Sequence, residues 1–267
     1  MRPRPATRRG LSALILVALA ATTGCGGTPA PTPTPTGGAS STPPDPSDAR
    51  ADLAARAALA QDRSATALYT LDSGGMPQRS VVATTATDGS WRVDIPGGAL
   101  GGTADVSIVR IEAGIFQCSL PSATRPTAST CVKVADTDER VPRRYDPKVQ
   151  RIFHDWLNVF TDRRAALSVS AAQPLSGASG SCYAVDSISA SLKAPVDVGI
   201  YCYAEDGLLT AARLELGDLR LAAAPAAAPP SVELPGPVVA GDPMGMEAPP
   251  PPPPPSDPAP SVSSSAP

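Results

Sequence analysis

Side chains able to act in catalysis are scarce in this chain. Its 267 residues include one histidine, His154, and a nucleophilic serine or cysteine needs such a base beside it. Asp155 follows His154 directly, so on a helix it points in another direction, and we expect no catalytic triad. Residues 177–181 (Gly-Ala-Ser-Gly-Ser) lack the G-x-S-x-G pattern of a nucleophile elbow. We predict no catalytic residue, with chemistry by carboxylates alone as the remaining alternative.

Two further segments could bind ions, and neither has the full pattern. Residues 97–102 are rich in glycine, but no Lys-Ser/Thr follows and a strand comes next, so a flexible connection is predicted instead of a phosphate cradle. Asp136, Asp138 and Glu139 lack the glycine and spacing of a calcium loop. Because arginines follow at once, this run reads as a solvated loop. We expect no metal and no cofactor.

Four of the five cysteines form an even set, and they are Cys118, Cys131, Cys182 and Cys202. Four cysteines allow three disulfide pairings. We favour Cys118–Cys131 and Cys182–Cys202, because each pair brackets its own local segment. Metal ligation is the rival interpretation, although no C-x-x-C spacing is present.

The fifth cysteine, Cys25, follows a secretory signal. Four arginines precede an apolar run at 11–21 that is too short to span a bilayer, and small residues lead into Cys25. This arrangement resembles the bacterial lipobox, which implies cleavage after residue 24 and lipidation of Cys25. The resemblance predicts a membrane lipid as partner and a location on the outer face of the cytoplasmic membrane. An ordinary secretory signal that runs into a cysteine is the alternative.

The export route is predicted from the same segment. Arg8 and Arg9 resemble a twin-arginine signal, but Sec export agrees better with disulfides that form outside the cell. We therefore favour Sec and keep the twin-arginine route as possible.

Composition divides the chain into one domain and two proline-rich segments. Residues 25–46 form a Pro/Thr-rich linker and residues 241–267 a Pro/Ser-rich tail, both predicted to be disordered. Residues 47–240 are left as a single domain. Without the four signal arginines, 18 basic residues stand against 25 acidic ones, and no basic patch is visible. Nucleic acid is therefore not expected as a partner.

The hydrophobic pattern of the domain predicts an α+β fold. An alanine-rich helix is expected at 47–61, and the most convincing helix at 147–163, with Pro147 in its first turn. Between and after these helices the pattern predicts antiparallel strands and one extended segment, at residues 66–71, 79–87, 90–95, 104–113, 115–120, 130–134, 182–188, 196–203, 208–216, 219–223 and 232–239.

This order of elements, the segment YCYAEDGLLT at 201–210 and the closing VELP at 232–235 look like the LolA-like lipoprotein superfamily. Its actinobacterial members include the LppX/LprG lipoproteins, and the excess of arginine over lysine is common in such GC-rich organisms. The resemblance implies a strongly curved antiparallel sheet, an open half-barrel, with helices on its concave face around an apolar cavity that carries lipid.

In this chain the resemblance points to a cavity lined from the second helix and from the strand at 196–203, by Phe153, Trp156, Leu157, Phe160, Val198 and Ile200. The function implied is a membrane-anchored envelope lipoprotein that binds or carries a lipid or other apolar ligand. The alternative is a non-enzymatic sensor or scaffold module that has a filled core and binds another envelope protein.

Overall fold

The computed structural model describes residues 46–123, 125–188 and 194–251. Cys25, the signal, the linker up to residue 45 and the tail from residue 252 lie outside the described residues. The unit described below belongs to residues 43–267.

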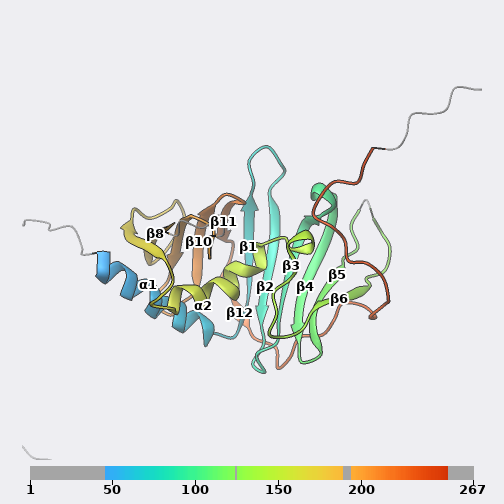
Figure 1. Ribbon diagram of the computed structural model, residues 1–267, viewed down its shortest axis with the longest axis horizontal. Coiled ribbons are helices and arrows are strands. Elements are labelled where there is room, and N and C mark those ends of the chain that lie inside the picture. Colours follow the sequence, from blue (N-terminus) through green and yellow to red (C-terminus); the bar gives the residue numbers. More distant parts are fainter. Residues whose placement is uncertain (1–45, 124, 189–193, 252–267) are drawn as a thin grey trace, which may run out of the picture. The chain divides into compact units, whose positions relative to one another are not determined.

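A twelve-stranded antiparallel sheet dominates the structure, with two α-helices (Figure 1). The strands follow the order β6-β5-β4-β3-β2-β1-β11-β10-β9-β8-β7, and β12 pairs with β1. Nearly every neighbour in this order is also a neighbour in the sequence, so the sheet consists of two meanders joined where β1 pairs with β11. The strands are β1 Ala65–Asp72, β2 Arg79–Thr85, β3 Trp91–Ala99, β4 Ala104–Ile111, β5 Gly114–Ser119, β6 Cys131–Ala135, β7 Leu167–Ala172, β8 Ser181–Ser187, β9 Gly199–Tyr203, β10 Leu209–Leu214, β11 Gly217–Leu221 and β12 Ala226–Ala227.

Alternation of apolar and polar side chains assigns the two faces of the sheet. In β3, Trp91, Val93 and Ile95 are at most 6% exposed and lie in the main core. Arg92 and Asp94 point to the opposite face and form an ion pair with each other, 2.7 Å from Nε to Oδ1. The β2–β3 turn contains the pair Asp88-Gly89, where Gly89 has a φ of 83°. We call the face of Trp91 the inner face.

Helix α1 (Pro46–Gln61) packs on the inner face, as its small residues allow. Leu53 and Ala57 are fully buried in the main core. The guanidinium of Arg50 donates hydrogen bonds to the carbonyls of Asp162, Ala165 and Leu167. These bonds attach α1 to the connection that precedes β7.

The helix predicted at 147–163 is wrong as a single element. The structure has a 3₁₀ helix, η3 (Val149–Phe153), and then the short helix α2 (Asp155–Thr161), separated at His154, whose φ and ψ of −139° and −72° are not helical. Pro147 is not in the first turn of η3, because Lys148 follows it in the left-handed region with φ 64°.

The contacts of Asp146 explain why η3 begins after Lys148 and not at Pro147. Its Oδ1 accepts bonds from the Lys148 amide and from Gln150 Nε2, and its Oδ2 pairs with Arg151. A buried carboxylate with so many partners fixes a tight first turn, and the break at His154 lets both short helices place apolar side chains on the sheet.

Three strand predictions need correction. β7 was missed, because its sequence LSVSAA holds only two large apolar residues. β9 begins at Gly199, so residues 196–198 precede it. Residues 97–99, predicted as a loop, belong to β3, where a Cβ on Gly98 would lie 2.6 Å from Cγ2 of Val106. There glycine permits close approach of β4.

Both predicted disulfides are confirmed. Cys118–Cys131 joins β5 to β6 and Cys182–Cys202 joins β8 to β9. Each lies on the outer face in its own small apolar cluster, apart from the main core.

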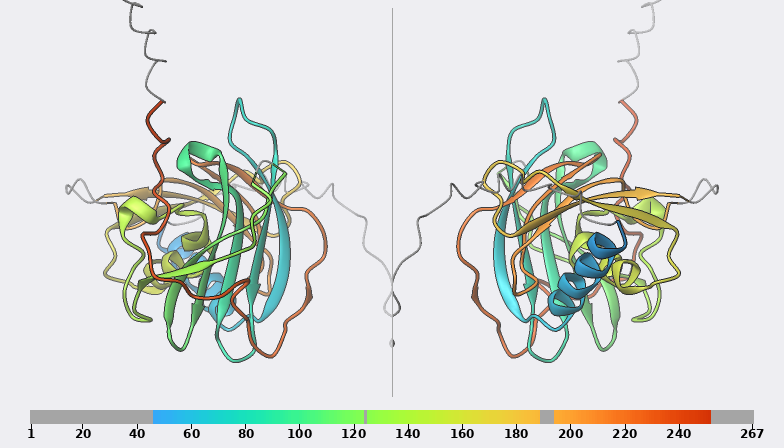
Figure 2. Two further views of the ribbon diagram at one scale, coloured as in Figure 1. Left: turned by 90° about the vertical axis from the view of Figure 1, so that its right-hand side faces the viewer. Right: turned by 90° about the vertical axis from the view of Figure 1, so that its left-hand side faces the viewer.

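Residues 222–248, which we call the C-terminal strap, continue the domain past its predicted end at residue 240. Figure 2 shows the strap passing along the β6 side of the sheet. Val232 packs in the outer cluster of Cys118–Cys131, and the amide of Val239 donates to the carbonyl of Cys131 at 2.9 Å. Beyond residue 240, Met244 and Met246 pack against the main core. The strap thereby covers the β6 edge, which would otherwise be open to pairing.

A truncated protein that ends at Ala240 tests whether the domain extends beyond this residue. The buried side chain of Gln117 accepts a bond from the Met244 amide at 2.6 Å and donates one to the Met244 carbonyl at 2.9 Å. We expect the truncation to lower the free energy of unfolding by about 1–3 kcal/mol, because these buried groups lose their partners. A chain ended after Pro251 is the control. Equal urea midpoints for the two chains would show that the domain ends at residue 240, as the sequence predicted.

Candidate functional site

Two of the six residues predicted to line a cavity, Trp156 and Phe160, fill the core instead. Trp156 and Phe160 are 3% and 1% exposed. Their rings contact Tyr201 edge-on, with centroids 6.2 and 5.0 Å apart. Tyr201 in turn donates a 2.6 Å hydrogen bond to the carbonyl of Asp197. Space between α2 and β9 is therefore occupied by aromatic side chains.

Val198 and Ile200 do not belong to the inner face, which corrects their assignment. Val198 is 51% exposed, and Ile200 packs in the outer cluster around Cys182–Cys202. The disulfide decides this placement, because Cys202 must face Cys182 on the outer side and side chains alternate along β9. Tyr201 therefore takes the inner position.

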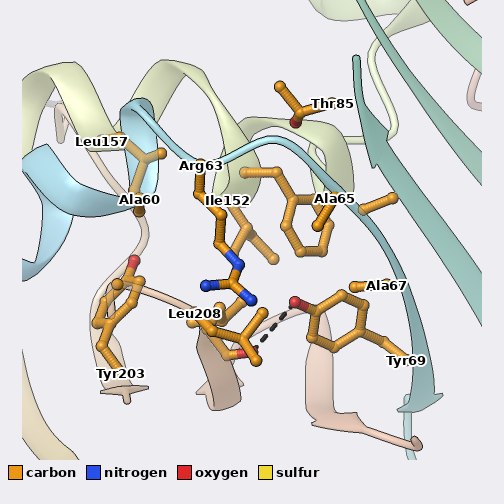
Figure 3. Close-up of a pocket in the computed structure, with 14 residues that line it drawn as sticks. Ala60, Arg63, Ala65, Ala67, Tyr69, Thr85, Ile152, Leu157, Tyr203 and Leu208 are labelled. Carbon is orange, nitrogen blue, oxygen red and sulfur yellow. Dashed lines mark hydrogen bonds between the residues drawn. The ribbon is translucent and has the colours of Figure 1, made fainter. Parts of the chain in front are cut away.

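Phe153 and Leu157, the remaining two predicted residues, line a small apolar cavity of about 60 Å³, which we call the inner pocket (Figure 3). It lies between the end of α1, η3 and α2, and the inner faces of β1, β2, β9 and β10. Alanine, leucine and isoleucine side chains form most of its wall, and Tyr69 contacts Phe153 with ring centroids 5.0 Å apart.

Four polar side chains line the inner pocket: Thr85, and Tyr69, Tyr203 and Arg63, which are described in turn. The Tyr69 hydroxyl donates to the carbonyl of Leu209 at 3.1 Å. The hydroxyl of Tyr203, which is 1% exposed, has no hydrogen-bond partner among the described residues. Burial raises the pKa of both phenols, so they stay neutral. Arg63 extends into the pocket and pairs with Asp206 at 2.5 Å (Figure 3). Tyr69, Tyr203 and Arg63 were not expected, because they lie on β1, on β9 and in the connection between α1 and β1, and only the tertiary structure brings them together.

A larger open groove of about 600 Å³ adjoins the inner pocket, and we call it the helix groove. The two share Ala60, Thr85, Phe153 and Leu157 as lining residues. Charged and titratable side chains of both signs line the rest of the groove, from β4, from the loop after β6 and from the start of α2: Arg110, Asp138, Glu139, Arg140, His154 and Asp155. The apolar inner pocket and the more polar helix groove are thus adjacent.

His154 is half-buried and lies at the break between η3 and α2. Its ring stacks on Trp91 with centroids 4.3 Å apart and planes at 13°. Its Nε2 is buried and has no partner among the described residues. Burial, and secondarily the charge of Arg110, lower the pKa of His154 to about 3. The ring is therefore neutral at physiological pH and is poorly suited to exchange protons in a reaction.

Neighbouring Asp155 has a carboxyl whose pKa is raised by burial, while Arg151 and Arg140 oppose the shift. Across the part of the chain that the structure describes, no group of three or more histidine, cysteine or acidic side chains could hold a metal ion. Nor does any helix in that part have both the length and the apolar character to cross a membrane.

No protein-family model matches the chain, and no curated protein matches its sequence.

Acid should destabilise the fold through His154. The folded pKa of about 3 lies below the ordinary value of 6.5, so below pH 6.5 the unfolded chain binds a proton that the folded chain does not. Stability contributed by the neutral ring is complete above pH 6.5 and falls as pH decreases. Between pH 7 and pH 5 we expect a loss of about 2 kcal/mol from this group.

His154→Phe keeps a ring over Trp91 and removes the titration. Urea unfolding at both pH values should show a smaller pH dependence for this variant, since all other groups are unchanged. An identical pH dependence for the two proteins would contradict the assignment.

Proposed function

We propose that this chain is an exported, lipid-anchored envelope protein, and that its domain is a non-enzymatic module that binds a peptide segment of another protein. The segment would lie in the helix groove and insert one apolar side chain into the inner pocket. The adjacency of these two spaces, which share four lining residues, is the observation that carries the proposal. A central apolar anchor with a polar surround is the usual anatomy of a protein-recognition site.

The charges of the helix groove support a peptide as the occupant. Arg110 and Arg140 stand with Asp138, Glu139 and Asp155, so neither sign dominates. Exposed amides of Gln61 and Asn158 add hydrogen-bonding groups, and they already bond to each other at 2.8 Å. Such mixed lining suits peptide groups and side chains of both charges better than it suits a hydrocarbon chain.

Carriage of a lipid inside the domain is less favoured by volume. Pockets that enclose small organic ligands measure about 300–1,000 Å³, whereas the inner pocket measures about 60 Å³. Trp156 and Phe160 occupy space that a carrier would leave for acyl chains. A filled core is what the interaction-module alternative requires.

For the fold, we propose the half-barrel arrangement, with α1 and α2 on a concave face. α1 contacts β7 at one edge of the sheet, and α1 and α2 contact each other. At the start of α2, His154 stacks on Trp91 of β3. β3 and β7 are seven places apart in the strand order, which is about 34 Å in a flat sheet. Two short helices reach both strands more readily if the sheet curves around them.

Membrane attachment rests on the lipobox resemblance at Cys25. Residues 26–46, at about 3.1 Å per residue if extended as polyproline II, would let the domain reach roughly 60 Å from the bilayer. Such a tether would allow the domain to meet partners across the envelope without leaving the membrane.

A photo-crosslinking experiment tests the proposed site. Asn158, exposed at the helix groove, is replaced by p-benzoylphenylalanine in the full chain in the cells that produce it. We expect one protein to be captured in a defined complex. The same group at Ser168, exposed on the outer side of β7, is the control and should not capture it.

A pair of matched substitutions on α1 tests whether capture depends on the inner pocket, because Ala60 lines both the pocket and the helix groove. Ala60→Phe should obstruct the mouth of the inner pocket and reduce capture at least about tenfold, whereas Ala58→Phe, the same change at an exposed position of α1, should not. Native mass spectrometry of the purified chain then discriminates the alternatives. If a lipid co-purifies in a stoichiometric amount and the crosslinker captures no protein, the peptide-binding proposal is overturned in favour of a lipid carrier.

A further inference from the structure

A second cavity of about 440 Å³ shares no lining residue with the inner pocket or the helix groove. It lies among the β1–β2 hairpin, the η1 segment (Leu100–Gly102) after β3, and the start of η3. Three cationic side chains line it: Arg79 from β2, Arg143 from η2 (Arg143–Tyr145) and Lys148. We call this cavity the cationic cleft.

Arg79 has no ionic partner here. It donates to the carbonyls of Pro96 and Gly97, each at 3.1 Å, and to the Ser73 hydroxyl at 2.7 Å, all of them neutral acceptors. Its Nε is buried without a partner, and none of the ion pairs found among the described residues includes it. Burial lowers the pKa of Arg79, and the charge of Asp105 opposes this only in part. A half-buried cation without a counter-ion is costly, and a bound anion would remove that cost.

The acidic group of the cleft does not fill this need. Asp146 lines the cleft, but its carboxylate is 2% exposed and is already held by Arg151, Gln150 and the Lys148 amide. Lys148 Nζ has only a loose contact with Asp197 at 3.8 Å. Arg143 forms no ion pair within the described part of the chain. The cleft therefore keeps an excess of positive charge.

The backbone around the cleft is unusual in the same place. Leu100 and Lys148 have φ values of 51° and 64°, and they are the two non-glycine residues with positive φ in the described chain. The backbone N–H of Leu100 donates a hydrogen bond to the carbonyl of Gly245, and that of Gly101 donates one to the carbonyl of Met246, both at 2.9 Å. Left-handed conformations of this kind concentrate at binding sites, where surrounding contacts hold them.

Apolar side chains form the rest of the wall. They come from β1, β3, η3, the strap, and the β1–β2 and β10–β11 turns, and they are Leu71, Met76, Ile95, Val149, Leu216 and Met246. Hydrated inorganic ions gain little from such a wall, whereas an apolar group attached to the anion would be buried against it.

We propose that the cationic cleft binds an organic anion, a phosphate or carboxylate attached to an apolar body. Arg79, Arg143 and Lys148 hold the anionic group, and the apolar wall holds the body. The site is separate from the peptide site proposed above, and either can exist without the other.

Isothermal titration calorimetry on the full chain in neutral detergent tests the site, with hexyl phosphate and hexanoate as probes. We expect at least one of the two to bind in a 1:1 ratio, at least about tenfold more tightly than inorganic phosphate and hexanol, and more weakly in high salt. Equal affinity for hexanol, or no saturable binding of either anion, would overturn the proposal.

Variants separate binding from folding. Arg143→Gln and Lys148→Gly should each weaken binding about tenfold, and Lys148→Gly should leave the melting temperature unchanged or higher, because glycine tolerates φ 64°. Arg164→Gln, a charge loss at an exposed position in the connection before β7, should leave the affinity unchanged. If neither Arg143→Gln nor Lys148→Gly changes the affinity for the anion, the anion binds elsewhere and the proposal is wrong. Ala60→Phe should not alter this titration, so the two proposals fail independently.

Discussion

The pairing of β1 with β11 is the constraint on which the rest of the structure depends. Residues 69–72 meet residues 218–221, about 150 positions later in the chain, and this contact joins two local meanders into one sheet. The Tyr69 hydroxyl reinforces the join by bonding to the carbonyl of Leu209 on β10. Without it, β2 and β10 would not present a common inner face, and neither α1 nor α2 would have a surface wide enough to cover. The inner pocket lies directly beside this join, since its wall draws on β1, β2, β9 and β10.

Aromatic packing then decides what kind of binding the inner face can support. Tyr201 faces Trp156 and Phe160, and Tyr69 faces Phe153, so large rings occupy the space under η3 and α2. Rings buried in this way contribute stability, but they leave only a small apolar cavity. Larger open spaces lined by charged side chains lie instead at the helix groove and the cationic cleft, where we propose that binding takes place. A domain of this form suits recognition of surfaces and charged groups better than storage of a long hydrocarbon.

The two disulfides and the C-terminal strap stabilise the outer face and the β6 edge of the sheet. Each disulfide joins neighbouring strands on the outer face, and the strap covers the β6 edge before returning to the core at Met244 and Met246. Gln117 receives the strap through two hydrogen bonds to the backbone of Met244. These features agree with the proposed export, because oxidising conditions outside the cell preserve disulfides and a covered edge prevents pairing with other chains.

The sequence by itself determined the local features of this protein. Alternation in Trp91–Ile95, the Asp-Gly turn at 88–89 and the alanine-rich helix follow from local periods and turn residues, and the paired cysteines are only 13 and 20 residues apart. Tertiary structure decided the rest. The apolar stripe at 149–160 matches one helix in the sequence, but Asp146 and Trp91 divide it, because a buried carboxylate and a stacked histidine are satisfied only by contacts made in three dimensions. Ile200 turned outward because Cys202 had to reach Cys182. Arg63, Tyr203 and Arg79 carry no local signal, since their surroundings arise from tertiary contacts, which leave Nε of both arginines and the hydroxyl of Tyr203 without a partner among the described residues.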